Sequence, residues 1–249
     1  MTDMIQQIEI TEARELFNKI PSSQNLTTLS PSYVLADGQR EPSIEVIFLK
    51  YENNNLFWLN GVHKSRINGT PFFDIQSPYG YGGPVCNTED TDFLKNAWTA
   101  YFDWCQNNSV MAEFVRFHPM AENWRYYGGE KKMDRTTVVI TTKNTDTLLN
   151  YKPRTRTSIR KAISAGLEFS MYPANELISQ FTHFYLKNMV NKGVASFYLF
   201  PDKYFESIGE IPGATIGLCS KGGKWLSAAI FLSSTEVIEY HLSATEPEG

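Results

Sequence analysis

Apolar and polar positions alternate in short runs over the first part of the chain. Residues 43–51 (SIEVIFLKY) and 55–64 (NLFWLNGVHK) are two apolar runs separated by a polar turn, which predicts a hairpin of two strands. Residues 71–76 (PFFDIQ) predict a third strand, and this strand leads into SPYGYGGP at residues 77–84. Two more strands are predicted over residues 111–119 (MAEFVRFHP) and 136–142 (TTVVITT).

Helical patterns accompany these strands. Residues 11–20 predict a short helix that ends before Pro21, and residues 22–32 follow as a polar linker. Residues 88–105 carry apolar side chains at spacings of three and four residues, which predicts a longer helix with Asp90 among its capping residues. The first part of the chain therefore combines strands with helices.

The composition changes near residue 150, and a similar order of elements begins again. Residues 151–166 (YKPRTRTSIRKAISAG) predict a basic helix with Pro153 in its first turn and Gly166 at its C-terminal cap. The other predicted elements are a strand over 167–173, helices over 174–193 and 201–210, and strands over 214–221, 224–234 and 236–245.

The two halves repeat one plan of elements with negligible sequence identity, so the repeat is architectural. We expect an α+β fold of two tandem units, residues 1–149 and 150–249, each a mixed, mostly antiparallel sheet flanked by helices. The second half stops after residues 236–245, where a helix should follow by analogy with the first half. We therefore expect the second unit to be incomplete at its C-terminal end and the chain to be a fragment.

Composition and charge narrow the class of protein. Because 42% of the residues are hydrophobic, the chain can bury a core, which excludes intrinsic disorder. The net charge of −4 argues against non-specific nucleic-acid binding by the whole surface. The first residues lack the pattern of a signal peptide, and no apolar run reaches about 18 residues, so we expect a cytoplasmic protein without a membrane span.

Cysteine and histidine spacing predicts no metal site. The cysteines are odd in number and widely spaced, which is typical of reduced thiols rather than a disulfide framework. The histidines have no ligand spacing with one another or with the cysteines. These residues are Cys86, Cys105 and Cys219, and His63, His118, His183 and His241.

The glycines of SPYGYGGP suggest a phosphate loop, but their spacing excludes one. Gly80 and Gly82 are followed directly by Gly83, so both the third glycine of a dinucleotide fingerprint and the lysine of a P-loop are absent. Two interpretations remain: a purely structural tight turn, or a turn that lines a ligand cleft. In the second case Gly82 and Gly83 allow close approach of the ligand, and Tyr79 and Tyr81 contact a sugar or peptide.

Two basic motifs are further candidates for binding. Arg156 and Arg160 lie four residues apart in the basic helix, where they form either a solvated face or a phosphate-binding pair of guanidinium forks. Arg116 and His118 lie two residues apart in a predicted strand and should therefore share a face, either as structural residues or beside a cleft.

The order strand, helix, helix, three antiparallel strands, helix, strand is similar to that of the GNAT acyltransferase fold. Two such units in tandem resemble the FemABX-like branch of that superfamily, including its FemAB-like acetyltransferases. The likeness spans nearly the whole chain and implies that both expected units are GNAT-like. It is carried by SPYGYGGP, by VRFHPMAEN, by RTSIRKAISAGLEF, and by FYLKNMVNKGVASFYLF together with EYHLSATEPEG.

This resemblance implies an N-acyltransferase that transfers an acetyl or aminoacyl group to an amine of a cell-envelope sugar or peptide precursor. The implied donor is an acyl-CoA, foremost acetyl-CoA, or an aminoacyl-tRNA. Tyr204 and Tyr240 match tyrosines that approach the acceptor in the family, and Tyr198 belongs to the same aromatic segment as Tyr204. Phe200 stands where the peptidoglycan-bridge enzymes have an arginine, which argues against a UDP-linked muropeptide acceptor.

The last predicted strand supplies the candidates for catalysis. By alternation, Glu239, His241 and Ser243 share one face and Tyr240 lies on the other, and the sequence leaves open which face lines the cleft. The resemblance implies that the amine loses its proton to a carboxylate, a histidine or water, so Glu239 or His241 is the candidate base. Without the expected closing segment, the chain alone is expected to be inactive.

Two other functions remain open. The first is a non-catalytic, GNAT-like pseudo-enzyme that binds a glycan or peptide without turnover. The second is a tRNA-dependent aminoacyl transferase of the peptidoglycan-bridge type. Such an enzyme would typically carry a broader basic surface than this sequence predicts, or a coiled-coil arm, and the sequence contains no heptad arm.

Overall fold

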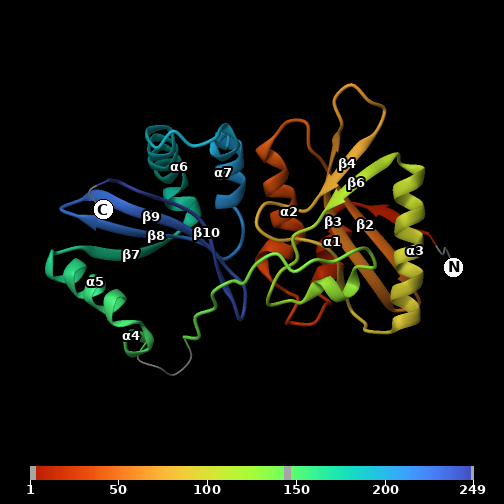
Figure 1. Ribbon diagram of the computed structural model, residues 1–249, viewed down its shortest axis with the longest axis horizontal. Helices are drawn as coiled ribbons and strands as arrows, with labels where there is room; N and C mark the ends of the chain where they lie inside the picture. The colour runs from red at the N-terminus through yellow and green to blue at the C-terminus, as the bar shows by residue number, and fades with distance from the viewer. Residues whose placement is uncertain (1–3, 143–146, 248–249) are drawn as a thin grey trace.

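Two separate β-sheets organise the computed structural model, which describes residues 4–142 and 147–247 (Figure 1). The first sheet contains β1 (Gln6–Ile8), β2 (Glu45–Asn53), β3 (Leu56–Arg66), β4 (Phe73–Gln76), β5 (Val85–Cys86) and β6 (Val110–Phe114). Its order is β1-β2-β3-β4-β6, with β5 paired to β3. The second sheet contains β7 (Glu168–Pro173), β8 (Ala214–Lys221), β9 (Lys224–Ser233) and β10 (Ile238–Thr245) in the order β10-β9-β8-β7.

Helices cover both faces of the first sheet. These helices are α1 (Ile10–Phe17), α2 (Pro31–Asp37) and α3 (Thr91–Asn107), with short 3-10 turns η1 (Thr27–Leu29), η2 (Gly38–Arg40) and η3 (Asn123–Tyr126). On the side of α1 and α2, Val34 belongs to the same buried cluster as Phe48 of β2. On the side of α3, the ring of Tyr101 packs on Trp58 with centroids 5.2 Å apart. The first sheet is therefore the middle layer of three.

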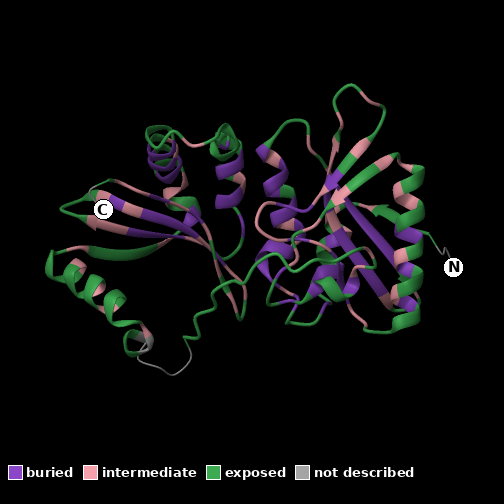
Figure 2. Ribbon diagram, in the orientation of Figure 1, coloured by how far each residue is buried: buried purple, intermediate pink, exposed green. Residues whose placement is uncertain are grey.

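The second sheet buries one face against two helices. The helices of this half are α4 (Thr147–Asn150), α5 (Pro153–Ser164), α6 (Ala174–Asn191) and α7 (Asp202–Gly209), with a 3-10 turn η4 (Ser196–Tyr198). Phe181 of α6 and Phe205 of α7 are fully buried with Ile230 of β9. The opposite face stays open, and Phe169 and Met171 of β7 are exposed there. Figure 2 shows α5 exposed along its length, with no buried residue.

The two halves share one order of elements. The first runs β1-α1-α2-β2-β3-β4, and the second runs β7-α6-α7-β8-β9-β10. The strands of each set lie in sequence order in their sheet, and all these neighbours are antiparallel. In the first half, α3 then leads to β6, which pairs with β4 in parallel. The predicted α+β architecture of two sheets flanked by helices is confirmed, although only the first sheet is mixed and all the described strand pairs of the second are antiparallel.

The halves meet through α2 and α7, which face each other between the sheets in Figure 1. Tyr33 and Ala36 of α2 belong to the same buried cluster as Tyr204 and Ile208 of α7. One hydrophobic core therefore continues from the second sheet into the first half. This contact fixes the walls of the cleft described below.

Three sequence predictions need correction. The linker predicted over residues 22–32 contains η1 and the start of α2, because Ser30 caps this short helix by accepting the Tyr33 N–H at 3.2 Å. Residues 136–142, predicted as a strand, have no regular secondary structure, and Val138 is 90% exposed. The strand predicted over 111–119 ends at Phe114. The boundary predicted between residues 149 and 150 lies within α4, while residues 1–3, 143–146 and 248–249 are outside the described part of the chain.

Candidate functional site

A cavity of about 970 Å³ lies between the two halves and is lined by residues of both. From the first half, the segment before β5 and the segment after β6 form one wall. From the second half, β10 forms the facing wall. The lining includes, from the residues singled out by sequence, Tyr79, Tyr81, Arg116, Glu239, Tyr240 and His241.

The carboxylate of Glu239 crosses from β10 to the first half. Its Oε1 accepts a hydrogen bond from the Thr28 hydroxyl at 2.6 Å, and its Oε2 accepts the Thr28 backbone N–H at 3.2 Å. His118 Nε2 lies 3.1 Å from Oε1. The Glu239 side chain is only 8% exposed and the His118 side chain 2%. Both carboxylate oxygens of Glu239 therefore have partners in the first half, which fix the side chain at the cavity.

The hydrogen bonds that His118 Nδ1 accepts determine which tautomer His118 adopts. Nδ1 accepts the backbone N–H groups of Met120 at 3.1 Å and Ala121 at 3.3 Å. A neutral imidazole has one bare nitrogen and one that carries the proton. The proton of neutral His118 is therefore on Nε2, which donates to Glu239.

A β-bulge shapes β10 at the cavity. Tyr240 pairs with Phe231 and Leu242 pairs with Ile230, so His241 is an extra residue in β10. The bulge allows His241 to face α7 while the next residue, Leu242, is buried in the core on the same side. The predicted common face of Glu239, His241 and Ser243 is therefore wrong for Ser243. The inserted residue shifts the alternation by one position.

His241 is an uncharged histidine at neutral pH. Burial lowers the pKa of His241 to about 4, and the nearby Glu239 carboxylate opposes this shift only in part. Its Nε2 lies 2.8 Å from the hydroxyl of Tyr204, a fully buried residue of α7. Among the described residues this hydroxyl has no other hydrogen-bond partner, so it donates to Nε2. The His241 proton is then on Nδ1.

The SPYGYGGP segment lines the cavity with its tyrosines. The Tyr79 ring lies 6.1 Å from the His241 ring between centroids, and the Tyr81 ring lies 4.7 Å from the His118 ring. Gly82 and Gly83 are not part of the lining. Gly82 donates its N–H to the Arg116 carbonyl at 2.9 Å, and a Cβ on Gly83 would come within 2.9 Å of the Val115 side chain. These two glycines therefore serve close backbone packing, which corrects their predicted role in ligand contact.

Arg116 and His118 do not share a face, contrary to the sequence prediction. Beyond Phe114 the chain leaves β6, and Phe117 only forms an isolated bridge with Gly82. His118 is buried against Glu239, whereas Arg116 is exposed at the cavity. In the part of the chain that the structure describes, the Arg116 guanidinium has no hydrogen-bond or ion-pair partner. It is therefore available to an anionic group of a ligand.

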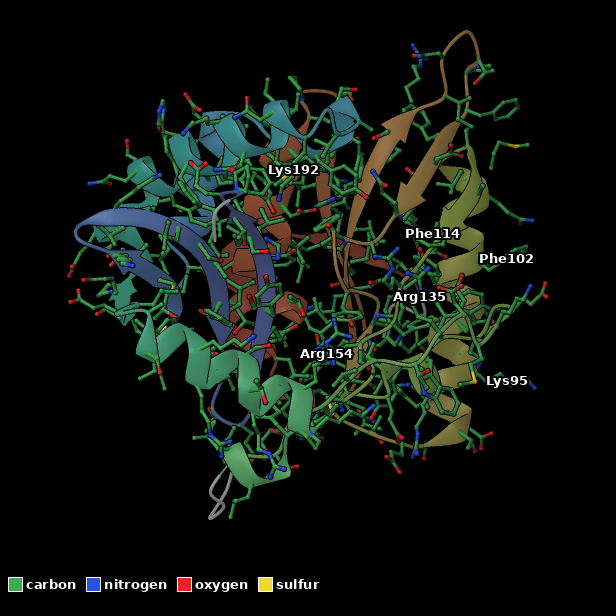
Figure 3. The ribbon with its side chains drawn as sticks, turned by 60° about the vertical axis from the view of Figure 1, so that its left-hand side comes forward. Lys95, Phe102, Phe114, Arg135, Arg154 and Lys192 are labelled. Carbon is green, nitrogen blue, oxygen red and sulfur yellow. The ribbon has the colours of Figure 1, made fainter. Side chains whose placement is uncertain are left out.

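Eight predicted binding residues are absent from the cavity lining. Gly82, Gly83, His118 and the buried Tyr204 pack behind it, Arg156 and Arg160 lie on helix α5, Tyr198 lies in η4, and Ser243 follows the bulge. Besides Arg116, the cations at the cavity come from the segment after η3 (Figure 3 labels Arg135 there and Arg154 at the start of α5). These cations are Lys131, Lys132 and Arg135.

Sequence reasoning missed Thr28, Tyr33 and the cavity-lining basic segment. The sequence KKMDR at residues 131–135 is a local cluster of charge and was the available signal for the segment. Thr28 has no such signal, because its role depends on a residue 211 positions later.

Among the described residues, no group of three or more His, Cys, Asp or Glu side chains could hold a metal ion. Over the same residues, every helix is too short or too polar to cross a bilayer.

The fold is similar to those of several solved structures, although no protein-family model and no curated protein matches the chain. FemX has a TM-score of 0.66 at 12% identity, over 98% of this chain and 81% of FemX. The C-terminal domain of a putative lysylphosphatidylglycerol synthetase from Agrobacterium fabrum has a TM-score of 0.52 at 14% identity, over 97% of this chain and 70% of that one. A conserved protein of unknown function from Bacteroides thetaiotaomicron has a TM-score of 0.54 at 10% identity, over 98% and 80%.

At these identities the similarity establishes the fold. The chain has a FemX-like fold, which confirms at the level of architecture the resemblance to FemABX-like, GNAT-related proteins. The residues that perform chemistry differ widely among proteins of one fold, so function has to be argued from the cavity.

Proposed function

We propose that the protein transfers an aminoacyl or other acyl group to the amine of an acceptor bound in the cavity between the two halves. The observation that carries this proposal is the Glu239 carboxylate, supplied by one half and held at the cavity by Thr28 and His118 of the other. The FemX-like fold and the transferase class implied by the sequence resemblance support it.

The reaction needs one proton acceptor and no covalent enzyme intermediate. The amine nitrogen attacks the ester or thioester carbonyl carbon, and a C–N bond forms while the carbonyl oxygen takes up negative charge. Glu239 takes the proton that the nitrogen must lose. The tetrahedral intermediate then collapses, the C–O or C–S bond breaks, and the leaving hydroxyl or thiol takes the proton from Glu239.

Other lining residues have roles that follow from their chemistry. The Nδ1–H of neutral His241 is suited to donate a hydrogen bond to the developing oxyanion, as a neutral imidazole donor. Tyr79, Tyr81 and Tyr240 offer aromatic walls to a sugar or peptide acceptor. Arg116 offers its guanidinium, which has no partner among the described residues, to a carboxylate or phosphate of either substrate.

We place an aminoacyl donor, carried by tRNA, ahead of acetyl-CoA. The name of one structural neighbour, a putative lysylphosphatidylglycerol synthetase, designates an aminoacylated product. The acceptor we propose is an amine on a cell-envelope amino sugar or peptide precursor, as the sequence resemblance implies. The cavity of about 970 Å³ has room for such an acceptor beside an aminoacyl ester.

The proposal is tested by supplying both donors to the purified protein. A pool of aminoacyl-tRNA and acetyl-CoA are each incubated with glucosamine or with a lysine-containing peptidoglycan-precursor peptide, and products are identified by mass spectrometry. We expect an amide product that requires acceptor and protein, at higher yield from aminoacyl-tRNA. Acceptor binding without any product from either donor would contradict the proposal and favour a binding protein.

A further inference from the structure

Three ionisable side chains are buried behind the SPYGYGGP segment and have no part in the proposed reaction. Asp37 and His63 are 0% exposed, and Arg40 is 7% exposed. Within the described residues, Asp37 Oδ1, Arg40 Nε and His63 Nδ1 lack hydrogen-bond partners. Burying incompletely paired charges is unfavourable, so their presence calls for a role beyond packing.

The clearest role of this group is to hold the backbone of one residue. The Tyr79 N–H donates to Asp37 Oδ2 at 2.8 Å. The Tyr33 hydroxyl donates a hydrogen bond to the Tyr79 carbonyl. Both polar backbone groups of Tyr79 are therefore bound by side chains of α2, an element 42 residues earlier in the chain.

The ring of Tyr79 lies among rings of the other half. Its centroid is 5.8 Å from that of Phe200, 6.1 Å from that of Phe197 and 6.1 Å from that of His241. The Arg40 guanidinium lies 5.5 Å from the centroid of Phe197. Tyr79 is thus fixed by α2 through its backbone and placed beside His241 through its ring.

We propose that Asp37 and Tyr33 are positioning residues that fix Tyr79 as the cavity wall beside His241 and thereby orient the acceptor for transfer. Neither side chain lines the cavity, so both act through Tyr79. The effect on transfer depends on the proposed function above, whereas the effect on Tyr79 does not. Loss of either hydrogen bond would allow Tyr79 to move, and it would remove no group that contacts the substrate.

The test compares four variants of the full chain. Asp37→Ala removes the acceptor of the Tyr79 N–H, while Asp37→Asn retains an acceptor oxygen. Tyr33→Phe removes the donor to the Tyr79 carbonyl and keeps the ring that contacts His241 edge-on. Tyr126→Phe is the matched control, because it removes a buried hydroxyl whose hydrogen-bond partner is Gln24 rather than a residue of the segment 77–84. Amide hydrogen exchange is followed over residues 77–83, and kcat and KM are measured for transfer.

We expect faster exchange over residues 77–83 in Asp37→Ala and Tyr33→Phe, with exchange near wild type in Asp37→Asn and Tyr126→Phe. The kcat of the first two should fall by about 10- to 100-fold, because misplacement of a substrate-orienting group slows transfer. Unchanged exchange in Asp37→Ala and Tyr33→Phe, or faster exchange with a kcat equal to that of Tyr126→Phe, would overturn the inference.

If Asp37→Ala does not fold, the comparison of Tyr33→Phe with Tyr126→Phe decides the inference. Absence of transfer in the wild type would contradict the proposed function, while the exchange data would still decide the role of Asp37 and Tyr33.

Discussion

Two histidines reach the cavity in different chemical states, and the difference lies in the partners of each nitrogen. His118 receives two backbone N–H groups on Nδ1 and donates Nε2–H to Glu239. His241 receives the Tyr204 hydroxyl on Nε2 and carries its proton on Nδ1. The sequence identified both histidines as candidates but contained no information about these partners, which come from distant parts of the chain.

Burial of His241 should make stability depend on pH in a defined window. The pKa of His241 is lowered from 6.5 to about 4 by burial, so the unfolded chain binds the proton more readily between these values. The stability associated with neutral His241 is therefore complete above about pH 6.5 and is lost as the pH falls toward 4. Between pH 7 and pH 5, the free energy of unfolding of the wild type should fall by about 2 kcal/mol more than that of His241→Gln. Urea unfolding at the two pH values measures this, and equal losses in the two proteins would contradict the assignment.

Short and irregular elements set the limits of sequence prediction here. The long helix α3 and the hairpin of β2 and β3 follow apolar periodicity and were predicted close to their observed bounds. The seven-residue helix α2 is too short to show periodicity, and its Ser30–Pro31 start was the only local signal. The bulge at His241 escaped prediction because Tyr240, Leu242 and Ala244 still alternate with polar residues in the sequence, as they would in a regular strand.

The cap of α2 should matter for both stability and transfer. Ser30→Ala removes the side chain that accepts the Tyr33 N–H, at a cost of about 1 kcal/mol in the free energy of unfolding. Asp90→Ala, which removes the equivalent cap of α3, is the control and should cost a similar amount. Because α2 carries Tyr33 and Asp37, we expect the transfer rate to fall in Ser30→Ala and to stay near wild type in Asp90→Ala. Denaturant unfolding and the transfer assay measure the two effects, and equal rates in both variants would contradict this dependence.

The arrangement of the two halves joins these local features into one site. The repeated order of elements was visible in the sequence, because each strand and helix carries its own pattern, and it led to the correct architecture. The way the halves meet was not visible, because the contacts of α2 with α7 and of Thr28 with Glu239 join residues far apart in sequence. The cavity-lining residues of β10 and the tyrosines of residues 77–84, together with His118, were singled out from the sequence, but Thr28 and Tyr33 were not. Residues 136–142 were wrongly predicted as a strand, since their β-forming composition has no partner strand among the residues that the structure describes.

The most direct test is the transfer rate of Glu239→Gln beside that of Glu236→Gln. Glutamine retains the size of Glu239 and an oxygen that can accept the Thr28 hydroxyl, but it cannot take a proton from the amine. Glu236 is an exposed carboxylate just before the same strand and provides the matched control. With aminoacyl-tRNA and an amine acceptor, we expect Glu239→Gln to be slower than the wild type by about 100-fold or more and Glu236→Gln to be unchanged. A Glu239→Gln protein that transfers at the wild-type rate would contradict the account.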